Sequence, residues 1–90
     1  MRLAAKVDSN QKIIVEALRK CGISVHSTAA IGRGFPDLIC AKGEKAWLIE
    51  VKGPKGELTE DQKIFMMHWQ GTVHIARTVD DALRIVGVLS

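Results

Sequence analysis

Residues 35–52 read FPDLICAKGEKAWLIEVK, and the rest of the chain is arranged around them. Two apolar runs rich in Leu, Ile and Val flank a polar tip that contains glycine, which is the pattern of a β-hairpin. If residues 43–44 form a two-residue loop, Lys42 pairs with Lys45. The sequence therefore predicts two antiparallel strands joined by this tight turn.

The far end of the hairpin carries an unusual set of charges. Counting outward from the loop places Asp37 opposite Glu50. Like charges directly opposite each other destabilise an antiparallel pair. Because side chains alternate between faces, Lys52 projects from the same side as Glu50. Two carboxylates and one amine therefore converge, and carboxylate oxygens suit Mg²⁺ better than zinc, which prefers Cys or His.

The composition predicts a small globular protein. Ninety residues make one domain spanning residues 1–90. Two Cys, no signal-like start and no apolar run approaching roughly 20 residues lead us to expect a soluble, cytoplasmic protein without membrane contact. A net charge of +3 permits nucleic-acid binding without demonstrating it. The low aromatic content argues against base stacking on an aromatic platform.

The flanking segments alternate between helical and extended patterns. Thr59 and Gln62 have the spacing of a capping box, and Gly22 ends the first helix. Residues 29–34 are expected to form a flexible connector. The predicted elements are, in order, a helix at 8–21, a strand at 23–28, the hairpin, a helix at 59–70, a strand at 72–77 and a helix at 78–86. This α-β-β-β-α-β-α order predicts an α/β fold with a central mixed sheet flanked by helices.

The charged end of the hairpin resembles a known nuclease motif. Pro36-Asp37, followed 13 residues after the Asp by Glu50-Val51-Lys52, is similar to the PD-(D/E)XK motif. The wider context resembles a stand-alone VRR-NUC domain, the virus-type replication-repair nuclease family, and it reads GFPDLI at 34–39, IEVKGPKG at 49–56 and LTEDQ at 58–62. The resemblance covers about residues 8–81 and implies a restriction-endonuclease-like fold.

The resemblance also implies an activity and a set of site residues. Asp37, Glu50 and the backbone carbonyl of Val51 would bind Mg²⁺ or Mn²⁺, and no small-molecule cofactor is expected. Such a metal ion neutralises phosphoryl charge and lowers the pKa of a bound water. Lys52 would lie near the attacking water, where an ammonium stabilises the pentavalent state. Gln62 matches the glutamine that the family carries at the start of the next helix. The implied enzyme is a DNA endonuclease that forms no covalent intermediate.

The first helix leaves one site residue open. The family carries an acid there, followed three residues later by Gln, and Asp8 with Gln11 fits this spacing with Asp in place of the more usual Glu. Asp8 would reach the metal through water, or act only as an N-cap. Alignment with junction resolvases instead places Gln11 where their acid stands. Glu16 is the nearest Glu, although the helical count points it to solvent.

The substrate is inferred from the same resemblance. Stand-alone members resemble Holliday-junction resolvases in size and element order, which implies a homodimer acting on branched DNA in a bacterial or phage-infected cytoplasm. Arg33, Lys55 and Lys63 lie in or just after the loops bordering the site and are candidates for phosphate contacts. Two alternatives stay open: a nucleic-acid-binding module of the same fold with impaired chemistry, which the departure at Asp8 favours, and a nuclease acting on flaps, duplexes or RNA.

Overall fold

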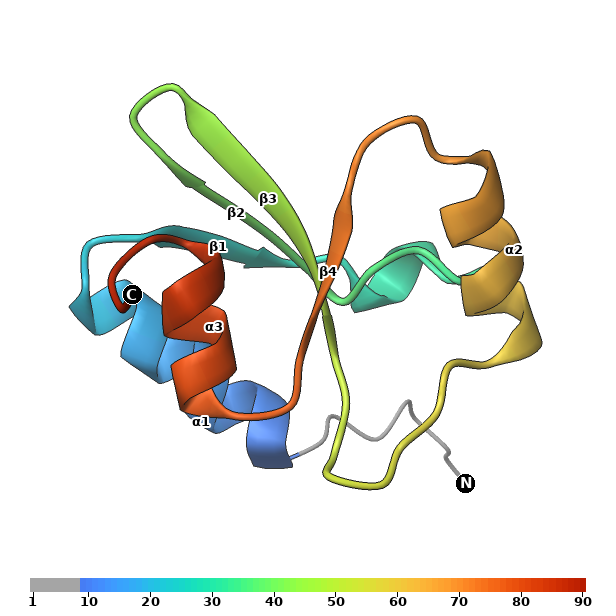
Figure 1. Cartoon of the computed structure of the whole chain (residues 1–90), viewed down its shortest axis with the longest axis horizontal. Helices are drawn as coiled ribbons and strands as arrows, with labels where there is room; N and C mark the ends of the chain where they lie inside the picture. Colours follow the sequence, from blue (N-terminus) through green and yellow to red (C-terminus); the bar gives the residue numbers. More distant parts are fainter. Residues whose placement is uncertain (1–8) are drawn as a thin grey trace.

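The computed structural model describes residues 9–90, which form an α/β fold with a four-stranded mixed sheet flanked by helices (Figure 1). The elements are, in chain order, α1 (Ser9–Lys20), β1 (Ser24–Ser27), the 3₁₀ turn η1 (Ala29–Ile31), β2 (Leu38–Lys42), β3 (Lys45–Val51), α2 (Glu60–His68), β4 (Val73–Ala76) and α3 (Val79–Ile85). The predicted order of helices and strands is confirmed.

The sheet has the strand order β1-β2-β3-β4. The pairs β1–β2 and β2–β3 are antiparallel, whereas β4 lies parallel to β3 after the crossover through α2. Lys42 pairs with Lys45, as the hairpin count predicts, and the register continues to Leu38 opposite Ile49. Asp37 and Glu50 are the next residues along the two strands, so the sheet brings them to the same end.

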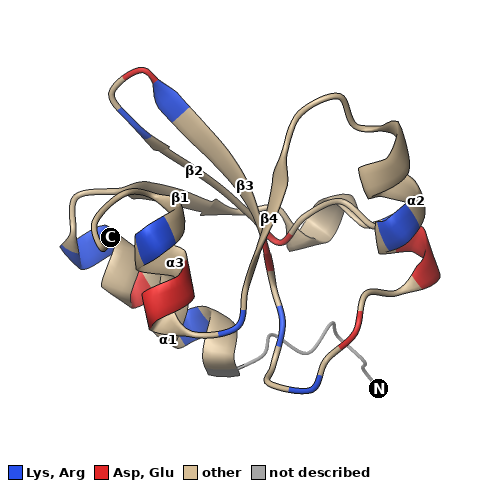
Figure 2. Cartoon of the chain, in the orientation of Figure 1, with Lys and Arg blue, Asp and Glu red and all other residues tan. Residues whose placement is uncertain are grey.

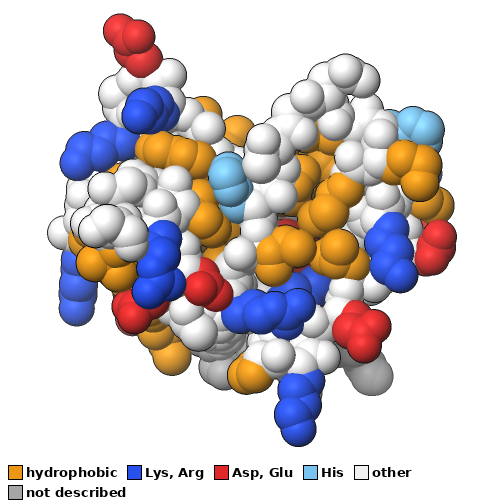
Figure 3. Space-filling model, viewed as in Figure 1, with side chains coloured by type: hydrophobic (Ala, Val, Ile, Leu, Met, Phe, Trp, Pro, Cys, Tyr) orange, Lys and Arg blue, Asp and Glu red, His pale blue; other side chains and the backbone are white. Residues whose placement is uncertain are grey.

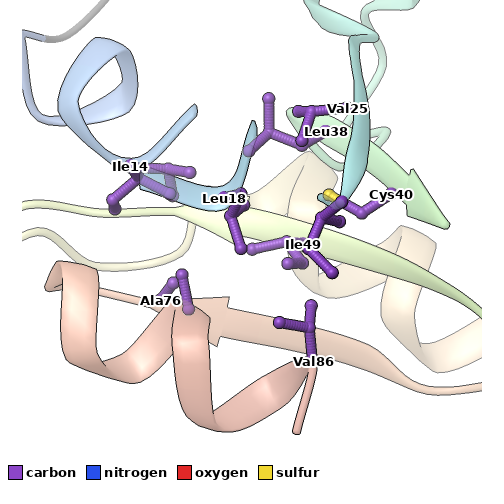
Figure 4. Close-up of a cluster of buried hydrophobic side chains, with 11 residues drawn as sticks. Ile14, Leu18, Val25, Leu38, Cys40, Ile49, Ala76 and Val86 are labelled. Atoms are coloured by element: carbon purple, nitrogen blue, oxygen red, sulfur yellow. The ribbon is translucent and has the colours of Figure 1, made fainter. Parts of the chain in front are cut away.

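The hydrophobic core lies on the face of the sheet covered by α1 and α3 (Figure 4). Ile14 and Leu18 of α1 are fully buried against strand residues such as Ile49. Removing these side chains from water stabilises the fold by about 1.5–3 kcal/mol for each large aliphatic residue. Burial raises the pKa of the Cys40 thiol to about 11, so this thiol stays protonated at neutral pH. The other cysteine, Cys21, is only half-buried.

Two capping boxes fix the starts of α2 and α3. The Thr59 hydroxyl accepts the N–H of Gln62, and the Gln62 side chain accepts the N–H of Thr59, as the spacing predicts. Thr78 and Asp81 repeat this arrangement at α3. Each box satisfies backbone donors that the first turn of a helix leaves without partners.

Two expectations about local structure were wrong. Part of the segment expected to be a flexible connector, Ala29–Ile31, forms a 3₁₀ turn. The helix α2 ends at His68 rather than near residue 70, and none of its residues is buried. Its C-cap residue Trp69 leaves the helix in an extended conformation, and its indole stacks on Phe65 with ring centroids 5.3 Å apart. Among residues 9–90, no helix has the length and apolar character needed to cross a bilayer.

Candidate active site

Asp37 is held by backbone groups on both sides. Its Oδ2 accepts the N–H of Val51 at 2.8 Å, and its carbonyl accepts the N–H of Thr28 at 2.8 Å. Asp37 follows the buried Pro36, whose ring restricts the backbone just before β2 begins. The position of this carboxylate is therefore fixed by the end of the sheet.

The Val51 peptide groups face the same side as Asp37. The N–H of Lys52 donates to the carbonyl of Ala76 in β4 at 3.0 Å. Because successive residues of a strand direct their peptide groups to opposite sides, Val51 directs its N–H and carbonyl away from β4. The hydrogen bond from the Val51 N–H to Asp37 agrees with this orientation. The Val51 carbonyl therefore lies on the side of the strand where Asp37 is.

Glu50 is a buried carboxylate with unequal oxygens. Its side chain is 2% exposed. Oε2 accepts the Nε2 amide of Gln62 at 2.8 Å and lies 3.6 Å from the Lys52 ammonium. Oε1 is buried and has no hydrogen-bond donor among the described residues. A buried acceptor without a partner is costly, so this oxygen marks a place where a proton or a cation would stabilise the structure.

The charge on Glu50 is strongly disfavoured. Burial, together with the neighbouring Asp37 carboxyl, raises the pKa of Glu50 to about 8, and Lys52 offsets this only in part. Asp37 and Glu50 can share a hydrogen bond only while one of them is protonated, because two carboxylates have no donor between them. At neutral pH, a divalent cation at this pair would replace the proton and satisfy both groups.

Gln62 connects the start of α2 to Glu50. Its Oε1 accepts the N–H of Thr59 at 2.9 Å in the capping box, while its Nε2 donates to Glu50. The two ends of one amide therefore serve the helix start and the buried carboxylate at the same time. The sequence left both roles open for this residue, and the geometry shows that they are compatible.

The oxygen atoms of this site fit a hard divalent metal. Mg²⁺ commonly binds through one or two carboxylates and keeps several waters. The carboxylates of Asp37 and Glu50 and the carbonyl of Val51 supply such ligands. Within residues 9–90, no group of three or more His, Cys, Asp or Glu side chains is arranged to hold a metal. The candidate ligands in the described chain are therefore the carboxylate pair and this carbonyl, and Oε1 of Glu50 is a buried acceptor that such an ion would satisfy.

The candidates on the first helix differ in their positions. Asp8 lies outside the described residues. Gln11 is buried, with 8% of its surface exposed, and lines a groove of about 330 Å³ between α1 and β1 together with Ser27. Glu16 is exposed, as the helical count predicts, and lines the same groove.

The three candidate phosphate contacts are exposed cations. Arg33 adopts φ 57° and lines a groove of about 550 Å³ along α2, beside Phe65 and Trp69. Lys55 follows Lys52 in the loop after β3, and Lys63 follows Gln62 on α2. Figure 2 shows acidic and basic positions close together at the end of β3 and in the following loop, and Figure 3 shows hydrophobic side chains in the hollow between the hairpin and α2.

Three residues that were not among the predicted site residues also bear on the site. Gly34 has φ 79°, and a Cβ added there would overlap the carbonyl oxygen of Asp61, so the loop before Asp37 packs directly on α2. Asn10 and Arg77 hold the loop after Lys52 through side-chain hydrogen bonds to backbone carbonyls. Gly34 begins the motif GFPDLI, whereas no local pattern pointed to Asn10 or Arg77.

Comparison with known proteins identifies the family. A family model described as the VRR-NUC domain matches residues 26–76, more than half of the chain, including the hairpin and the residues Asp37, Glu50 and Lys52. Neither the curated proteins nor the solved structures provide a match. The chain belongs to the VRR-NUC family, and this membership indicates a nuclease-type function.

Proposed function

We propose that this protein is an endonuclease that hydrolyses DNA phosphodiester bonds with Mg²⁺ or Mn²⁺ held by Asp37, Glu50 and the Val51 carbonyl. The observation that carries the proposal is the buried Glu50, whose Oε1 has no donor among the described residues and whose pKa is raised to about 8 beside a second carboxyl group. A structural carboxylate would be expected to have its hydrogen bonds satisfied. A carboxylate pair that binds a cation, by contrast, is expected to have an oxygen without a hydrogen-bond donor in the metal-free protein.

The residues of the site have distinct tasks in the proposed reaction. A metal ion held by Asp37, Glu50 and the Val51 carbonyl would neutralise phosphoryl charge and lower the pKa of water. Asp37 is oriented by the Val51 N–H, and Glu50 by the Gln62 amide. Lys52, with 13% of its side chain exposed, keeps its ammonium beside Glu50 and stabilises the negative charge that develops on the phosphate.

The proposed substrate is branched DNA, cut by a homodimer with one site in each subunit. The exposed Arg33, Lys55 and Lys63 support contact with phosphates near the site. Self-association is supported by the exposed apolar side chains of α2, where Ile64 is 45% and Met67 75% exposed. Such residues on a small sheet protein suit burial by a second subunit.

The second candidate function is a nucleic-acid-binding module with impaired chemistry. The feature that favours it is the sequence at position 8, where Asp stands in place of the Glu that is more usual in the family. Both candidates predict binding to nucleic acid, but only the endonuclease predicts cleavage. The two are therefore separated by chemistry rather than by affinity.

The test is cleavage of a labelled four-way junction with Mg²⁺ or Mn²⁺ by the wild-type protein and by the Asp37→Asn and Lys52→Ala variants. The proposal predicts cleavage by the wild type and a loss on the order of 100- to 1000-fold in Lys52→Ala. Lys45→Ala, at the exposed hairpin tip, is the control and should retain activity. Cleavage that survives both Asp37→Asn and Lys52→Ala would contradict the site assignment. Binding without cleavage would favour the second candidate, and competition among junction, flap, duplex and RNA would identify the substrate.

A further inference from the structure

The loop after Lys52 is held by a single arginine side chain. Arg77 Nη1 donates hydrogen bonds to the carbonyls of Gly53 at 2.6 Å and Gly56 at 2.8 Å. The N–H of Gly56 also donates to the carbonyl of Gly53 at 3.2 Å. The guanidinium therefore binds both ends of the turn formed by residues 53–56 and fixes it against the end of β4.

Asn10 fixes the start of the same loop. Its Nδ2 amide donates to the carbonyl of Lys52 at 3.0 Å and to the carbonyl of Arg77 at 3.1 Å. These carbonyls follow the last residues of the parallel strands β3 and β4. One side chain of α1 therefore joins the ends of both strands, and it does so beside the Arg77 side chain that holds the turn.

Arg77 is itself anchored to α3. Its N–H donates to Asp81 Oδ2 at 2.8 Å, within the capping box that Thr78 and Asp81 form. This N–H lowers the pKa of Asp81, and the Thr78 groups lower it further, so the carboxylate is ionised and accepts strongly at neutral pH. The turn after Lys52 is thus connected through Arg77 to α1 and α3, the helices that cover the core face of the sheet.

The held turn lies beside the Lys52 side chain. A Cβ added at Gly56 would make ordinary contact, at 3.6 Å, with Cβ and Cδ of Lys52, so Gly56 borders the aliphatic part of that side chain. The backbone of Lys52 is bound at both ends, with its N–H on Ala76 and its carbonyl on Asn10. The side chain carries the ammonium, which lies 3.6 Å from Glu50 Oε2.

We propose that Asn10 and Arg77 are positioning residues for Lys52: by fixing residues 53–56 over the Lys52 side chain, they hold its ammonium at the carboxylate pair. This inference rests on the proposed nuclease function of the same site. Their hydrogen bonds go to the carbonyls of the loop and of the strand ends, beginning with that of Lys52 itself, so the inferred effect on the reaction passes through Lys52.

The first test is a double-mutant cycle measured by single-turnover cleavage with excess enzyme. Arg77→Ala should lower the rate about 10- to 100-fold when Lys52 is present, because misplacement by about 1 Å has effects of this size. In the Lys52→Ala background, the same change should cause no further loss, since residues that act through one another are not additive. An equal loss in both backgrounds would overturn the inference. Lys45→Ala, at the exposed hairpin tip, has no part in these hydrogen bonds; it is the control and should leave the rate unchanged.

The second test does not depend on cleavage. Hydrogen–deuterium exchange of the metal-free protein should become faster in residues 52–57 when Arg77 is replaced by Ala, and it should stay unchanged in residues 38–50. Asn10→Ala should show the same local increase in exchange. This second variant provides the test if Arg77→Ala does not fold. Unchanged exchange at residues 52–57, or a uniform increase along the chain, would overturn the positioning role. A wild-type protein that cleaves no nucleic acid would overturn the proposed function instead, while the exchange result would still decide whether this loop is held as inferred.

Discussion

The two faces of the sheet are built differently. On one face, α1 and α3 close an apolar core in which Ile14, Leu18 and Ile49 are fully buried. On the other face, α2 buries none of its residues and is attached through the Gln62–Glu50 hydrogen bond and the edge-to-face contact of Phe35 with Phe65, whose centroids lie 5.2 Å apart. The closed face supplies most of the stability, and the open face carries the charged site.

The difference separates stability from function. A buried carboxylate with a raised pKa and an unsatisfied oxygen is destabilising, and proteins keep such groups mainly at functional sites. Here Glu50 lies in a central strand whose other face is fully packed. The rigid core can therefore hold a strained charge arrangement at the end of the sheet.

The largest expected effect is on the closed face. Leu18→Ala should lower the free energy of unfolding by about 2–5 kcal/mol, because it removes buried methyl groups and leaves a cavity. Ile64→Ala on α2, where the side chain is 45% exposed, should change it by no more than about 0.5 kcal/mol. Chemical denaturation measures both values. Similar losses in the two variants would show that α2 contributes to stability as much as α1 does.

The next effect tests the contact between the loop before Asp37 and α2. Gly34→Ala would place a Cβ against the Asp61 backbone at a positive φ, and we expect a loss of about 1–3 kcal/mol from overpacking in addition to the conformational strain. Gly43→Ala shares a positive φ at the hairpin tip but meets no atom within 4 Å. Gly43→Ala therefore measures the conformational strain alone. If Gly34→Ala and Gly43→Ala lost equal stability in thermal and chemical unfolding, the packed contact between Gly34 and Asp61 would be contradicted.

A smaller effect on metal binding and cleavage is expected from the Gln62 amide, which connects the start of α2 to Glu50. Gln62→Ala removes the donor to Glu50 Oε2, and we expect metal affinity and cleavage to fall about 10- to 100-fold, as for other partners of metal ligands. Gln70→Ala, in the exposed segment after α2, is the control. Calorimetric Mn²⁺ titration and single-turnover cleavage provide the two measurements. Unchanged metal affinity and cleavage rate in Gln62→Ala would show that Gln62 acts only in the capping box of α2.

A further prediction concerns pH and the metal-free protein. The folded-state pKa of Glu50, about 8, lies above its usual value of 4.5, so the fold favours the protonated form. The contribution of Glu50 to stability is therefore fully present below pH 4.5 and is lost as the pH rises through about 8. Melting temperatures without metal should decline over this range more in the wild type than in Glu50→Gln. Equal slopes would show that Glu50 does not titrate in this way.

Local patterns were sufficient to predict most of the fold. The Gly-containing turn fixed the pairing of Lys42 with Lys45, and the Thr59–Gln62 spacing located the start of α2. Both signals depend on residues close together in sequence. Counting outward from the same turn also predicts that Asp37 and Glu50 lie at one end of the sheet, because pairing in a hairpin continues in register from its loop.

The remaining features depend on contacts that sequence spacing does not encode. The helix α2 carries apolar residues, among them Ile64 and Met67, but its sequence does not reveal whether the chain supplies anything to cover them. Asn10 and Arg77 are separated from the groups they bind by between 21 and 67 residues. Their roles depend on the packing of β3, β4 and α1 against one another.

The most direct test is a calorimetric titration of the metal-free protein with Mn²⁺ at about pH 8, in the wild type and in Asp37→Asn. We predict binding to the wild type and its loss in Asp37→Asn, with Asp80→Asn, an exposed acid of α3, retaining wild-type affinity. Equal Mn²⁺ affinity in the wild type and Asp37→Asn would contradict a metal site at the end of this hairpin.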